Sequence, residues 1–497
     1  MNTFATTTTA NGTKSVLTLE SINQRVRTME YAVRGVLPIR AEGIQRGLDA
    51  GESDKYAFNK TVFCNIGNPQ QLGQKPLTYL RQLSALVDYP ELLSEKNYEI
   101  TKQLFPEKVI ERAKETLNAA VSVGAYSGST GLEVVRRNVA AFIEKRDGFP
   151  SDFKNIQLTN GASGAVERVL ELLVAHDKVG IMIPIPQYPL YSASLTRFGA
   201  HAVSYYLQEQ KEWGLDINGL KTSVSEARAK GIEVRALVII NPGNPTGSVL
   251  TLENMEQVVR FCEDEGLVLL ADEVYQQNVY YKQDKPFHSF KKVVSSLKSS
   301  VELFSFHSIS KGMIGECGRR GGYLEMHNIP QPISDVMFKM ASVSLCPNVL
   351  GQIAVDVMVK PPSQEEDPES HKQYNDELKA IYDSLKRRAE KLCNAFNSQE
   401  NINCNVAEGS MYLFPQIKLP AKFVQECKDR GDLPPDQEYS LAMLNATGVC
   451  VVPGSGFGQV DGTYHFRCTF LPPEGDFDQF VATFGEFNQS FIKKYSN

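Results

Sequence analysis

The sequence has no long hydrophobic run. None of its apolar stretches approaches the roughly 18 to 20 residues that a transmembrane helix needs, so we expect no membrane partner. An excess of positive charge is also absent: the formal net charge is −6, and the basic residues are scattered along the chain. Proteins that bind nucleic acid usually carry a clustered basic surface. The sequence therefore predicts small-molecule partners and no nucleic acid.

Closely spaced cysteine pairs and histidine clusters are missing as well. The nine cysteines include no CxxC motif, and their odd number argues against a complete set of disulfides. Such a pattern favours a reducing compartment. The seven histidines show no spacing typical of metal ligands, so we expect no metal site.

The first dozen residues, MNTFATTTTANG, lack two targeting signals. They have neither the apolar core of a secretory signal nor the arginines of a mitochondrial presequence. We therefore expect a disordered tail over residues 1–17 and a cytoplasmic protein. From Leu19 to Val33 the apolar residues recur at helical spacing, which predicts a short amphipathic helix that stops at Gly35, before Pro38.

The length and the apolar content predict two domains. The chain has 497 residues, of which 42% are apolar, which is enough for a large buried core. Its middle part alternates apolar runs with helical patterns, as in a parallel sheet with crossover helices. Helices are also expected at 102–121 and 131–146. The predicted strands are Ile156–Thr159, Val179–Ile185, Ala202–Leu207, Arg235–Ile240, Leu267–Ala271 and Val301–Phe306.

The last third of the chain has a different character. The prolines and acids of KPPSQEEDPES (360–370) predict a mobile loop, which a long helix through Asn397 should follow. Further strands are expected at 448–457 and 463–470, in a smaller α+β domain. The predicted division is a tail (1–17), an arm that joins the small domain (18–75), a large domain (76–350) and the small domain (351–497).

One stretch near the middle, FSFHSISKGMIGECGRRGGY (304–323), combines a lysine with phosphate-binding side chains. Lys311 follows a β-type run, with Ser308 and Ser310 before it and Arg319 and Arg320 after it. A lysine amine forms a Schiff base with a carbonyl, while hydroxyls and guanidinium groups suit a phosphate dianion. The pattern indicates pyridoxal 5′-phosphate. A serine-rich loop with surface basic residues is the alternative interpretation.

Polar side chains also follow two of the predicted strands. Asn244 lies in NPGNPTG after one strand, and Asp272 and Tyr275 follow another. The carboxyl ends of parallel strands meet at one edge of a sheet, so these groups should converge with Lys311. Alternatively, Asp272 caps a helix and NPGNPTG is an ordinary proline-rich turn.

A turn of small residues follows the strand Ile156–Thr159. Asn160, Gly161, Ala162 and Ser163 open a predicted helix, and free N–H groups at a helix start can bind an anion. Strand, glycine turn and helix also describe many purely structural crossovers.

Several segments together resemble the class-I pyridoxal-phosphate-dependent aminotransferases, and most closely their alanine subgroup. The resemblance covers nearly the whole chain. It implies the aspartate aminotransferase fold type: an α/β large domain with a mostly parallel seven-stranded sheet and flanking helices, and a smaller α+β domain. It also implies a homodimer. The segments are YAVRG (31–35), CNIGNPQ (64–70), NPGNPTG (241–247), ADEVYQ (271–276), HSISKGMIGECGRRGGY (307–323) and HFRCTFLPP (465–473).

The resemblance implies roles around the cofactor ring. Lys311 would hold the cofactor as a Schiff base and then move the reacting proton. Asp272 would keep the ring nitrogen protonated. Tyr275 and Asn244 would bind the ring oxygen, and Tyr188 would stack on the ring face.

The same resemblance implies phosphate and substrate ligands. One departure concerns the phosphate: the spacing from the lysine to the arginine is longer by one residue than in the commonest pattern, so Arg320 fits better than Arg319 without excluding it. Arg467 would bind the substrate carboxylate, next to Asn244 and the Gly67 amide. The implied phosphate ligands are Ala162, Ser163, Ser308, Arg320 and, from a second subunit, Tyr126.

The activity implied by the resemblance is transamination. L-alanine and 2-oxoglutarate would give pyruvate and L-glutamate by a ping-pong mechanism. A glutamate:glyoxylate or other small-amino-acid aminotransferase is the alternative. Other interpretations are a different reaction of the same cofactor, such as a β-lyase, and a non-catalytic protein on the same fold, which would be expected to lose Lys311 or Asp272.

Overall fold

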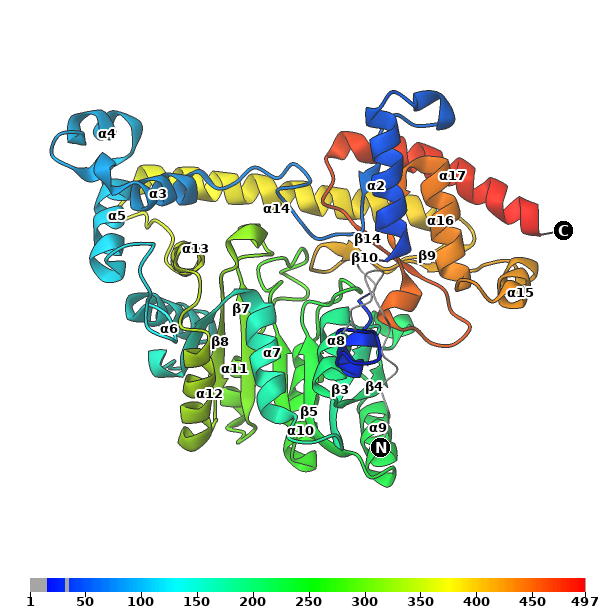
Figure 1. The fold of residues 1–497 in the computed structure, drawn as a ribbon, viewed down its shortest axis with the longest axis horizontal. Helices are drawn as coiled ribbons and strands as arrows, with labels where there is room; N and C mark the ends of the chain where they lie inside the picture. Colours follow the sequence, from blue (N-terminus) through cyan, green and yellow to red (C-terminus); the bar gives the residue numbers. More distant parts are fainter. Residues whose placement is uncertain (1–15, 32–34, 497) are drawn as a thin grey trace.

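A seven-stranded sheet is the centre of the computed structural model, which describes residues 16–31 and 35–496 (Figure 1). Its strands are β2 (Ile156–Thr159), β3 (Val179–Ile185), β4 (His201–Tyr206), β5 (Glu233–Ile240), β6 (Val268–Asp272), β7 (Leu303–Ser308) and β8 (Gly322–His327). Their order is β2-β8-β7-β6-β5-β3-β4. Strands β3 to β7 pair in parallel, and β8 is antiparallel to both of its neighbours. The predicted α/β class with a mostly parallel seven-stranded sheet is confirmed.

Helices cover both faces of this sheet. In β5, Ala236 and Val238 pack against one set of helices, whereas Leu237 and Ile239 pack against the other. A strand that is buried on both sides is a nearly continuous apolar run, which is why β5 could be predicted from its sequence. One face carries α7 (Gly161–Leu173), α8 (Pro189–Phe198) and α12 (Gln331–Val343); the other carries α9 (Ile217–Ala229), α10 (Leu252–Glu265) and α11 (Phe290–Leu297).

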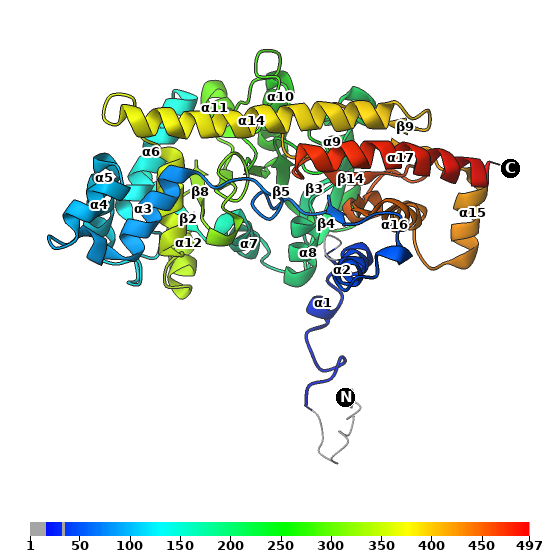
Figure 2. The ribbon, with the colours of Figure 1, turned by 90° about the horizontal axis from the view of Figure 1, so that it is seen from above.

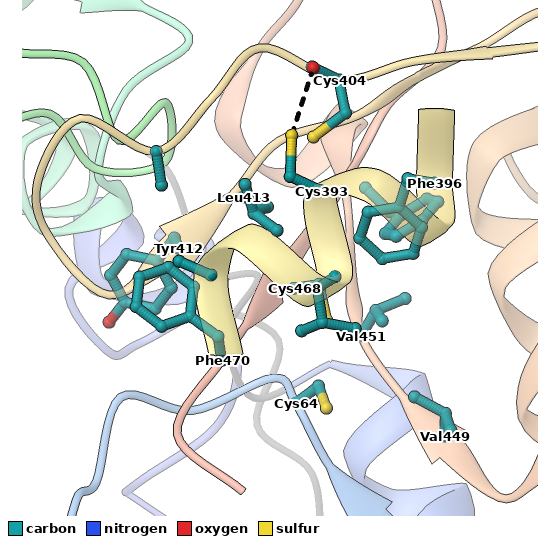
Figure 3. Packing of buried hydrophobic residues seen from close by; sticks show 14 of the residues in the cluster. Cys64, Cys393, Phe396, Cys404, Tyr412, Leu413, Val449, Val451, Cys468 and Phe470 are labelled. Carbon is teal, nitrogen blue, oxygen red and sulfur yellow. Dashed lines mark hydrogen bonds between the residues drawn. The ribbon is translucent and has the colours of Figure 1, made fainter. Parts of the chain in front are cut away.

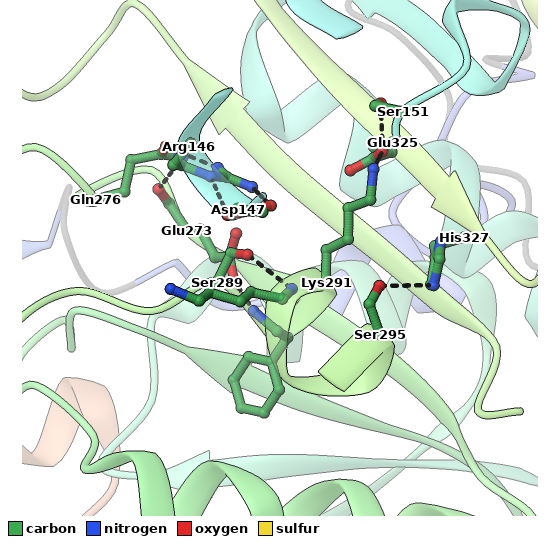
Figure 4. A network of polar contacts seen from close by, with 12 residues as sticks. Arg146, Asp147, Ser151, Glu273, Gln276, Ser289, Lys291, Ser295, Glu325 and His327 are labelled. Carbon is green, nitrogen blue, oxygen red and sulfur yellow. Dashed lines mark hydrogen bonds and ion pairs between the residues drawn. The ribbon is translucent and has the colours of Figure 1, made fainter. Parts of the chain in front are cut away.

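Strand β8 has no counterpart among the predicted strands; only its first two residues, Gly322 and Tyr323, lie in the stretch 304–323 that was singled out around Lys311. The carboxylate of Glu325 is buried in the middle of this strand, where an apolar residue would be expected. Lys291 of α11 is equally buried and pairs with Glu325 at 2.5 Å (Figure 4). Buried charges of this kind occur in pairs, and a pair between distant segments cannot be read from local sequence.

A further group of helices packs beside β2. Leu158 of β2 shares a core with these helices. A single helix over 102–121 is wrong: α4 ends at Leu104 and α5 starts after Pro106, which has no N–H to continue a helix. The helix predicted at 131–146 is confirmed within two residues as α6. The group comprises α3 (Thr78–Asp88), α4 (Tyr98–Leu104), α5 (Glu107–Ala120), α6 (Glu133–Asp147) and α13 (Val349–Val359).

A smaller α+β region lies beyond one end of the sheet, along α14 (Pro368–Asn397) and α17 (Glu474–Tyr495), which run side by side (Figures 1 and 2). Figure 3 shows its core, in which Cys393 and Phe396 of α14 lie near Cys468. The long helix through Asn397 is confirmed, and it starts within the predicted loop. The other elements are β9 (Ile402–Asn403), β10 (Tyr412–Leu413), β11 (Gln416–Ile417), α15 (Ala421–Arg430), α16 (Pro435–Thr447), β12 (Val449–Cys450), β13 (Val452–Pro453) and β14 (Phe466–Thr469).

The N-terminal segment also contacts this smaller region. Helix α2 (Val36–Asp49) packs on α16, and β1 (Val62–Phe63) pairs in parallel with β12. A helix over residues 19–33 is wrong, since only α1 (Gln24–Arg27) forms among the described residues of that stretch. Pro38 lies in the first turn of α2, where a missing N–H costs nothing.

Two parts of the predicted organisation are not decided by this arrangement. The tail predicted over residues 1–17 lies outside the described residues except for its last two. The boundaries drawn at residues 75 and 350 stay a prediction.

Within residues 16–31 and 35–496, no helix is long and apolar enough to cross a membrane. Over the same residues, no group of three or more His, Cys, Asp or Glu side chains is arranged to hold a metal ion.

Candidate active site

A cavity of about 390 Å³ lies at the carboxyl ends of β5, β6 and β7. Asp272 ends β6, and it lies in register between Ile240 of β5 and Phe306 of β7. The loops that follow these strands therefore meet at one edge of the sheet, as expected for a ligand site in an open parallel sheet. The predicted site residues that line the cavity are Gly67, Ala162, Ser163, Tyr188, Asn244, Asp272, Tyr275, Ser308, Lys311, Arg320 and Arg467.

Lys311 points into this cavity. Its Nζ donates a hydrogen bond to the carbonyl oxygen of Gly67 at 2.6 Å. A methyl group built on Gly67 would lie 2.8 Å from Lys311 Nζ and 2.1 Å from Tyr412 Oη. Only glycine leaves room for this close approach.

Arg320 and two serine hydroxyls form a cradle of hydrogen-bonding groups in the cavity wall. Arg320 Nη2 donates to Ser163 Oγ at 3.1 Å and its Nη1 to Ser310 Oγ at 3.3 Å. Ser163 lies in the first turn of α7, where backbone N–H groups have no partner within the helix. Arg319 turns away and donates to Glu316 at 3.2 Å. Of the two arginines, Arg320 is therefore the one that faces the cavity.

Asp272 also lines the cavity, and its carboxylate is buried. Burial raises its pKa to about 6, although a hydrogen bond from Tyr191, the Val274 amide and the charge on Lys311 oppose this shift. Tyr191 Oη donates to Asp272 Oδ2 at 2.9 Å. The sequence analysis did not identify Tyr191; the only local signal was its position one helical turn after Tyr188.

A pair of tyrosines lines the cavity as well. Tyr275 Oη donates to Tyr412 Oη at 3.3 Å, and the rings meet edge to face with centroids 6.0 Å apart. Burial raises the pKa of Tyr275 well above its usual value. Tyr412 comes from β10 of the smaller region, and no motif in the sequence singled it out.

A second tyrosine pair lies at another wall of the cavity. The hydroxyls of Tyr31 and Tyr188 are 3.1 Å apart, and burial, followed by Tyr31, raises the pKa of Tyr188. Tyr31 belongs to the YAVRG segment, so the motif was recognised but this residue was not assigned a role.

Arg467 is a buried cation at the cavity wall, with only 2% of its surface exposed. Its Nη1 donates to Asn244 Oδ1 at 3.0 Å and its Nη2 to the Asn65 carbonyl at 2.6 Å. Within the described chain its Nε has no hydrogen-bond partner and no carboxylate pairs with it. An unpaired buried charge is costly, so this guanidinium is suited to an anion that enters the cavity.

Tyr126 is the one predicted site residue that does not line the cavity. Its side chain is 78% exposed. Its neighbour Ser127 accepts a hydrogen bond from Gln352 of α13 at 2.9 Å, which fixes the loop on the outside of this chain.

The side chains that are present fit pyridoxal phosphate. The cofactor needs an amine for its aldehyde, donors for its phosphate and an acid for its ring nitrogen. Lys311, the Arg320 cradle and Asp272 line the cavity and can supply these three groups in turn. A buried arginine remains for a carboxylate.

The family model for aminotransferases of class I and II matches residues 91–484. The chain belongs to this family. As a member it is a pyridoxal-phosphate-dependent enzyme that transfers amino groups, and the rival assignment to a non-catalytic protein is wrong.

Close relatives of this aminotransferase have names that specify substrates. It is 51% identical to a probable mitochondrial alanine aminotransferase of Dictyostelium discoideum, over 97% of this chain and 90% of that one. It is 49% identical to the mitochondrial alanine aminotransferase 2 of Arabidopsis thaliana, over 97% and 88%. It is also 47% identical to the glutamate–glyoxylate aminotransferase 2 of the same plant, over 97% and 98%.

Solved structures confirm the fold of this aminotransferase. An alanine aminotransferase from Pyrococcus furiosus superposes with a TM-score of 0.73 at 22% identity, over 94% of this chain and all of that one. An aspartate aminotransferase from Thermus thermophilus, with maleate, gives 0.68 at 15% identity, over 94% and 99%.

The expectation of a cytoplasmic location is contradicted by the relatives. Those from Dictyostelium discoideum and two from Arabidopsis thaliana are named mitochondrial. The expectation rested on the absence of arginines from the first dozen residues. The absence of one targeting pattern does not identify a compartment, so the inference was unsound.

Proposed function

We propose that this aminotransferase exchanges the amino group between L-alanine and 2-oxoglutarate, giving pyruvate and L-glutamate by a ping-pong mechanism. The observation that carries the proposal is Arg467, whose buried guanidinium has no acidic partner among residues 16–31 and 35–496 and lines the same cavity as Lys311. All four reactants share the α-carboxylate that such a group binds bidentately. The identity of the substrate side chains is inferred from the names of the relatives.

The residues of this chain would hold the cofactor at both ends. Bound pyridoxal phosphate supplies an aldehyde that takes up the amino group and a ring that accepts electrons. Its phosphate would be held by Arg320, Ser308 and the Ala162 and Ser163 amides. Tyr188 would cover one ring face, and Tyr275 and Asn244 would donate to the ring oxygen.

Two residues would control the protons. Lys311 holds the cofactor covalently, and its Nζ, once released, moves the proton from the α-carbon of the substrate. Asp272 would remain ionised against the ring nitrogen and keep that nitrogen protonated. The cofactor cation would offset the burial that now raises the Asp272 pKa.

A single-turnover panel tests the substrate assignment. The purified, cofactor-loaded enzyme is mixed with alanine, glutamate, aspartate, glycine, tyrosine or kynurenine, and the loss of the visible band is followed. Alanine and glutamate should react much faster than aspartate or the aromatic amino acids. A panel led by aspartate or an aromatic amino acid would overturn the assignment without affecting the fold or the cofactor.

A second candidate is transfer from glutamate to glyoxylate. The observation that favours it is the 47% and 46% identity to two relatives named glutamate–glyoxylate aminotransferases. The same Arg467 would bind the glyoxylate carboxylate. Comparing the reverse half-reaction with pyruvate and with glyoxylate decides between the two.

We further propose a homodimer in which Tyr126 reaches the phosphate of the partner's cofactor. Tyr126 is exposed and lies outside the cavity of its own chain. Large apolar side chains of α5, α6, α12 and the residues that follow α5 and α12 are also exposed, and exposed apolar side chains can mark an interaction surface. They include Val121, Val134, Phe338, Val343 and Leu345.

A further inference from the structure

Tyr412 stands between the two cationic groups of the site. Its ring lies under the Arg467 guanidinium, with 4.1 Å between the guanidinium carbon and the ring centroid. Its hydroxyl and Lys311 Nζ lie against the same side of Gly67, because a methyl group there would clash with both. One side chain therefore touches the carboxylate-binding arginine and adjoins the reactive lysine.

The Tyr412 hydroxyl has a defined hydrogen-bond partner. Tyr275 donates to it at 3.3 Å, so one lone pair of Tyr412 Oη is occupied and its own proton is directed elsewhere. Tyr412 itself is buried, with 2% of its surface exposed. Bulk water therefore does not compete freely for this hydroxyl.

The surrounding charges favour the ionised form of Tyr412. Burial by itself would raise its pKa, but the charges on Lys311 and Arg467 and the hydrogen bond from Tyr275 outweigh burial and lower it, while the Cys317 thiol opposes them. Tyr188 is a further neighbour of Tyr412, and burial raises its pKa, so it stays neutral. Asp272, Tyr31 and Arg320 also line the cavity.

We propose that Tyr412 is a positioning residue that couples the proton on Lys311 to the occupation of Arg467. In the empty site the phenolate is stabilised by both cations. A carboxylate that binds Arg467 neutralises its charge, so Arg467 then stabilises the phenolate of Tyr412 less. Tyr412 Oη therefore takes a proton from the Lys311 nitrogen. The Nζ–H bond breaks, the Oη–H bond forms and the net charge is unchanged. In the loaded enzyme this step applies to Lys311 after its release from the cofactor, while the substrate carboxylate is still bound to Arg467.

This coupling rests on the proposed function only through the carboxylate that Arg467 binds. It would make amino-group transfer depend on a bound carboxylate, because a neutral amine is the form that acts as nucleophile and base. A phenylalanine at position 412 would keep the ring beneath Arg467 and lose only the hydroxyl. The Tyr412→Phe variant thus separates proton coupling from packing.

The first test is an ultraviolet titration of tyrosinate in the full-length, cofactor-free protein. The wild type should show a tyrosinate that forms below the usual tyrosine range of about 10, and Tyr412→Phe should lack it. Acetate, as a probe carboxylate, should move this step to higher pH in the wild type. Tyr280→Phe is the matched control: Tyr280 is a buried tyrosine whose pKa is raised by burial and whose hydroxyl donates to the Ser410 carbonyl. It should leave the step in place.

Either of two results would overturn the coupling: identical titrations of the wild type and Tyr412→Phe, or a step that acetate does not move. Neither result depends on which amino acid is the substrate. A failure here is therefore distinguishable from a failure of the alanine assignment.

The second test uses the cofactor-loaded enzyme. Tyr412→Phe should lower kcat with alanine on the order of 10²-fold at neutral pH, the scale of a lost acid–base contribution. The loss should shrink as the pH rises, because solvent then removes the proton, and KM should change little. A raised KM with an unchanged kcat and pH profile would mean that Tyr412 only packs against Arg467, and it would reject the proposal.

Discussion

Asp272 is placed where its charge opposes folding and where, in our proposal, catalysis needs that charge. Burial raises its pKa from 3.8 to about 6 in the cofactor-free chain. The folded state therefore binds this proton more tightly than the unfolded state. Below the unfolded-state pKa of 3.8, the bound proton contributes its full share to the free energy of unfolding. This contribution is lost as the pH rises through the folded-state pKa of about 6. Cofactor binding supplies the missing partner.

Replacing this residue should have opposite effects on stability and activity. In the cofactor-free protein, Asp272→Asn should be more stable than the wild type at neutral pH by roughly 2–3 kcal/mol, the equivalent of the pKa shift. The difference should vanish at acidic pH, as measured by denaturant unfolding at several pH values. With cofactor bound, turnover should fall by several kcal/mol in activation free energy. Near-normal turnover would remove Asp272 from its proposed role.

Among the described residues that line the cavity, Lys311 is the only lysine. We expect the cofactor-loaded enzyme to show a visible band that depends on pH and that borohydride bleaches, since reduction fixes the Schiff base. Peptide mass mapping should locate the reduced adduct on Lys311. Lys311→Ala should abolish turnover and retain part of the cofactor binding. An adduct on any other lysine would show that the assignment is wrong.

At the scale of elements, a buried charge network joins α6 to the loop that carries Tyr275 (Figure 4). Arg146 donates to both carboxylate oxygens of Asp147, at 2.7 and 2.6 Å, and to Gln276 at 2.8 Å. Glu273 lies close by, with a pKa that burial raises to about 8 and that Arg146 lowers. Its carboxylate accepts a hydrogen bond from the Phe290 amide at 2.8 Å, which ties the loop to α11.

Removing one charged residue of this network should lower the free energy of unfolding more than removing both members of an ion pair. Arg146→Met leaves Asp147 buried without its cation and should destabilise the fold by about 3–5 kcal/mol. The double variant Arg146→Met/Asp147→Leu should recover much of that loss, because no uncompensated charge remains. Unfolding free energies of the two single variants and the double variant measure the coupling. Additive costs would show that the pair acts only through packing.

The elements that sequence analysis found are those that local composition determines. Strand β3 is buried on both faces and is a continuous apolar run, and β5 is such a run from Ala236 to Ile240. Strand β8 was missed because Glu325 interrupts its pattern, and the compensating Lys291 lies on a distant helix. The helix predicted over residues 19–33 was wrong for another reason. Leu19, Val26 and Met29 stay exposed, and helical spacing alone, with little apolar burial, does not hold a long helix together.

The candidate site shows the same limit. Lys311, Asp272 and Asn244 follow strands in motifs that carry their own chemistry, so they could be predicted. Tyr412 and Tyr191 have no motif, and their importance appears only when distant segments fold together. Tyr412 in particular comes from the smaller region and reaches a cavity at the end of the large sheet.

At the scale of the whole molecule, the cavity is built from both regions of one chain. The sheet supplies Asp272 and Lys311, the smaller region supplies Arg467 and Tyr412, and the N-terminal segment supplies Gly67. The cofactor and substrate sites therefore depend on how the regions are held together. Tyr126 alone faces away, toward the surface that we propose a second copy covers.

Mixing two inactive variants tests whether the site is shared between subunits. A Lys311→Ala chain and a Tyr126→Phe chain are purified separately, unfolded or dissociated together, and allowed to reassemble. If Tyr126 serves the partner's cofactor, each heterodimer contains one site with both defects and one site with neither, so the mixture should gain activity over both parents. If Tyr126 serves its own chain, each site carries one defect and no gain appears. Mixing each variant with itself is the control, and the mass in solution shows whether a dimer forms at all. A monomeric mass with full activity would contradict the shared site.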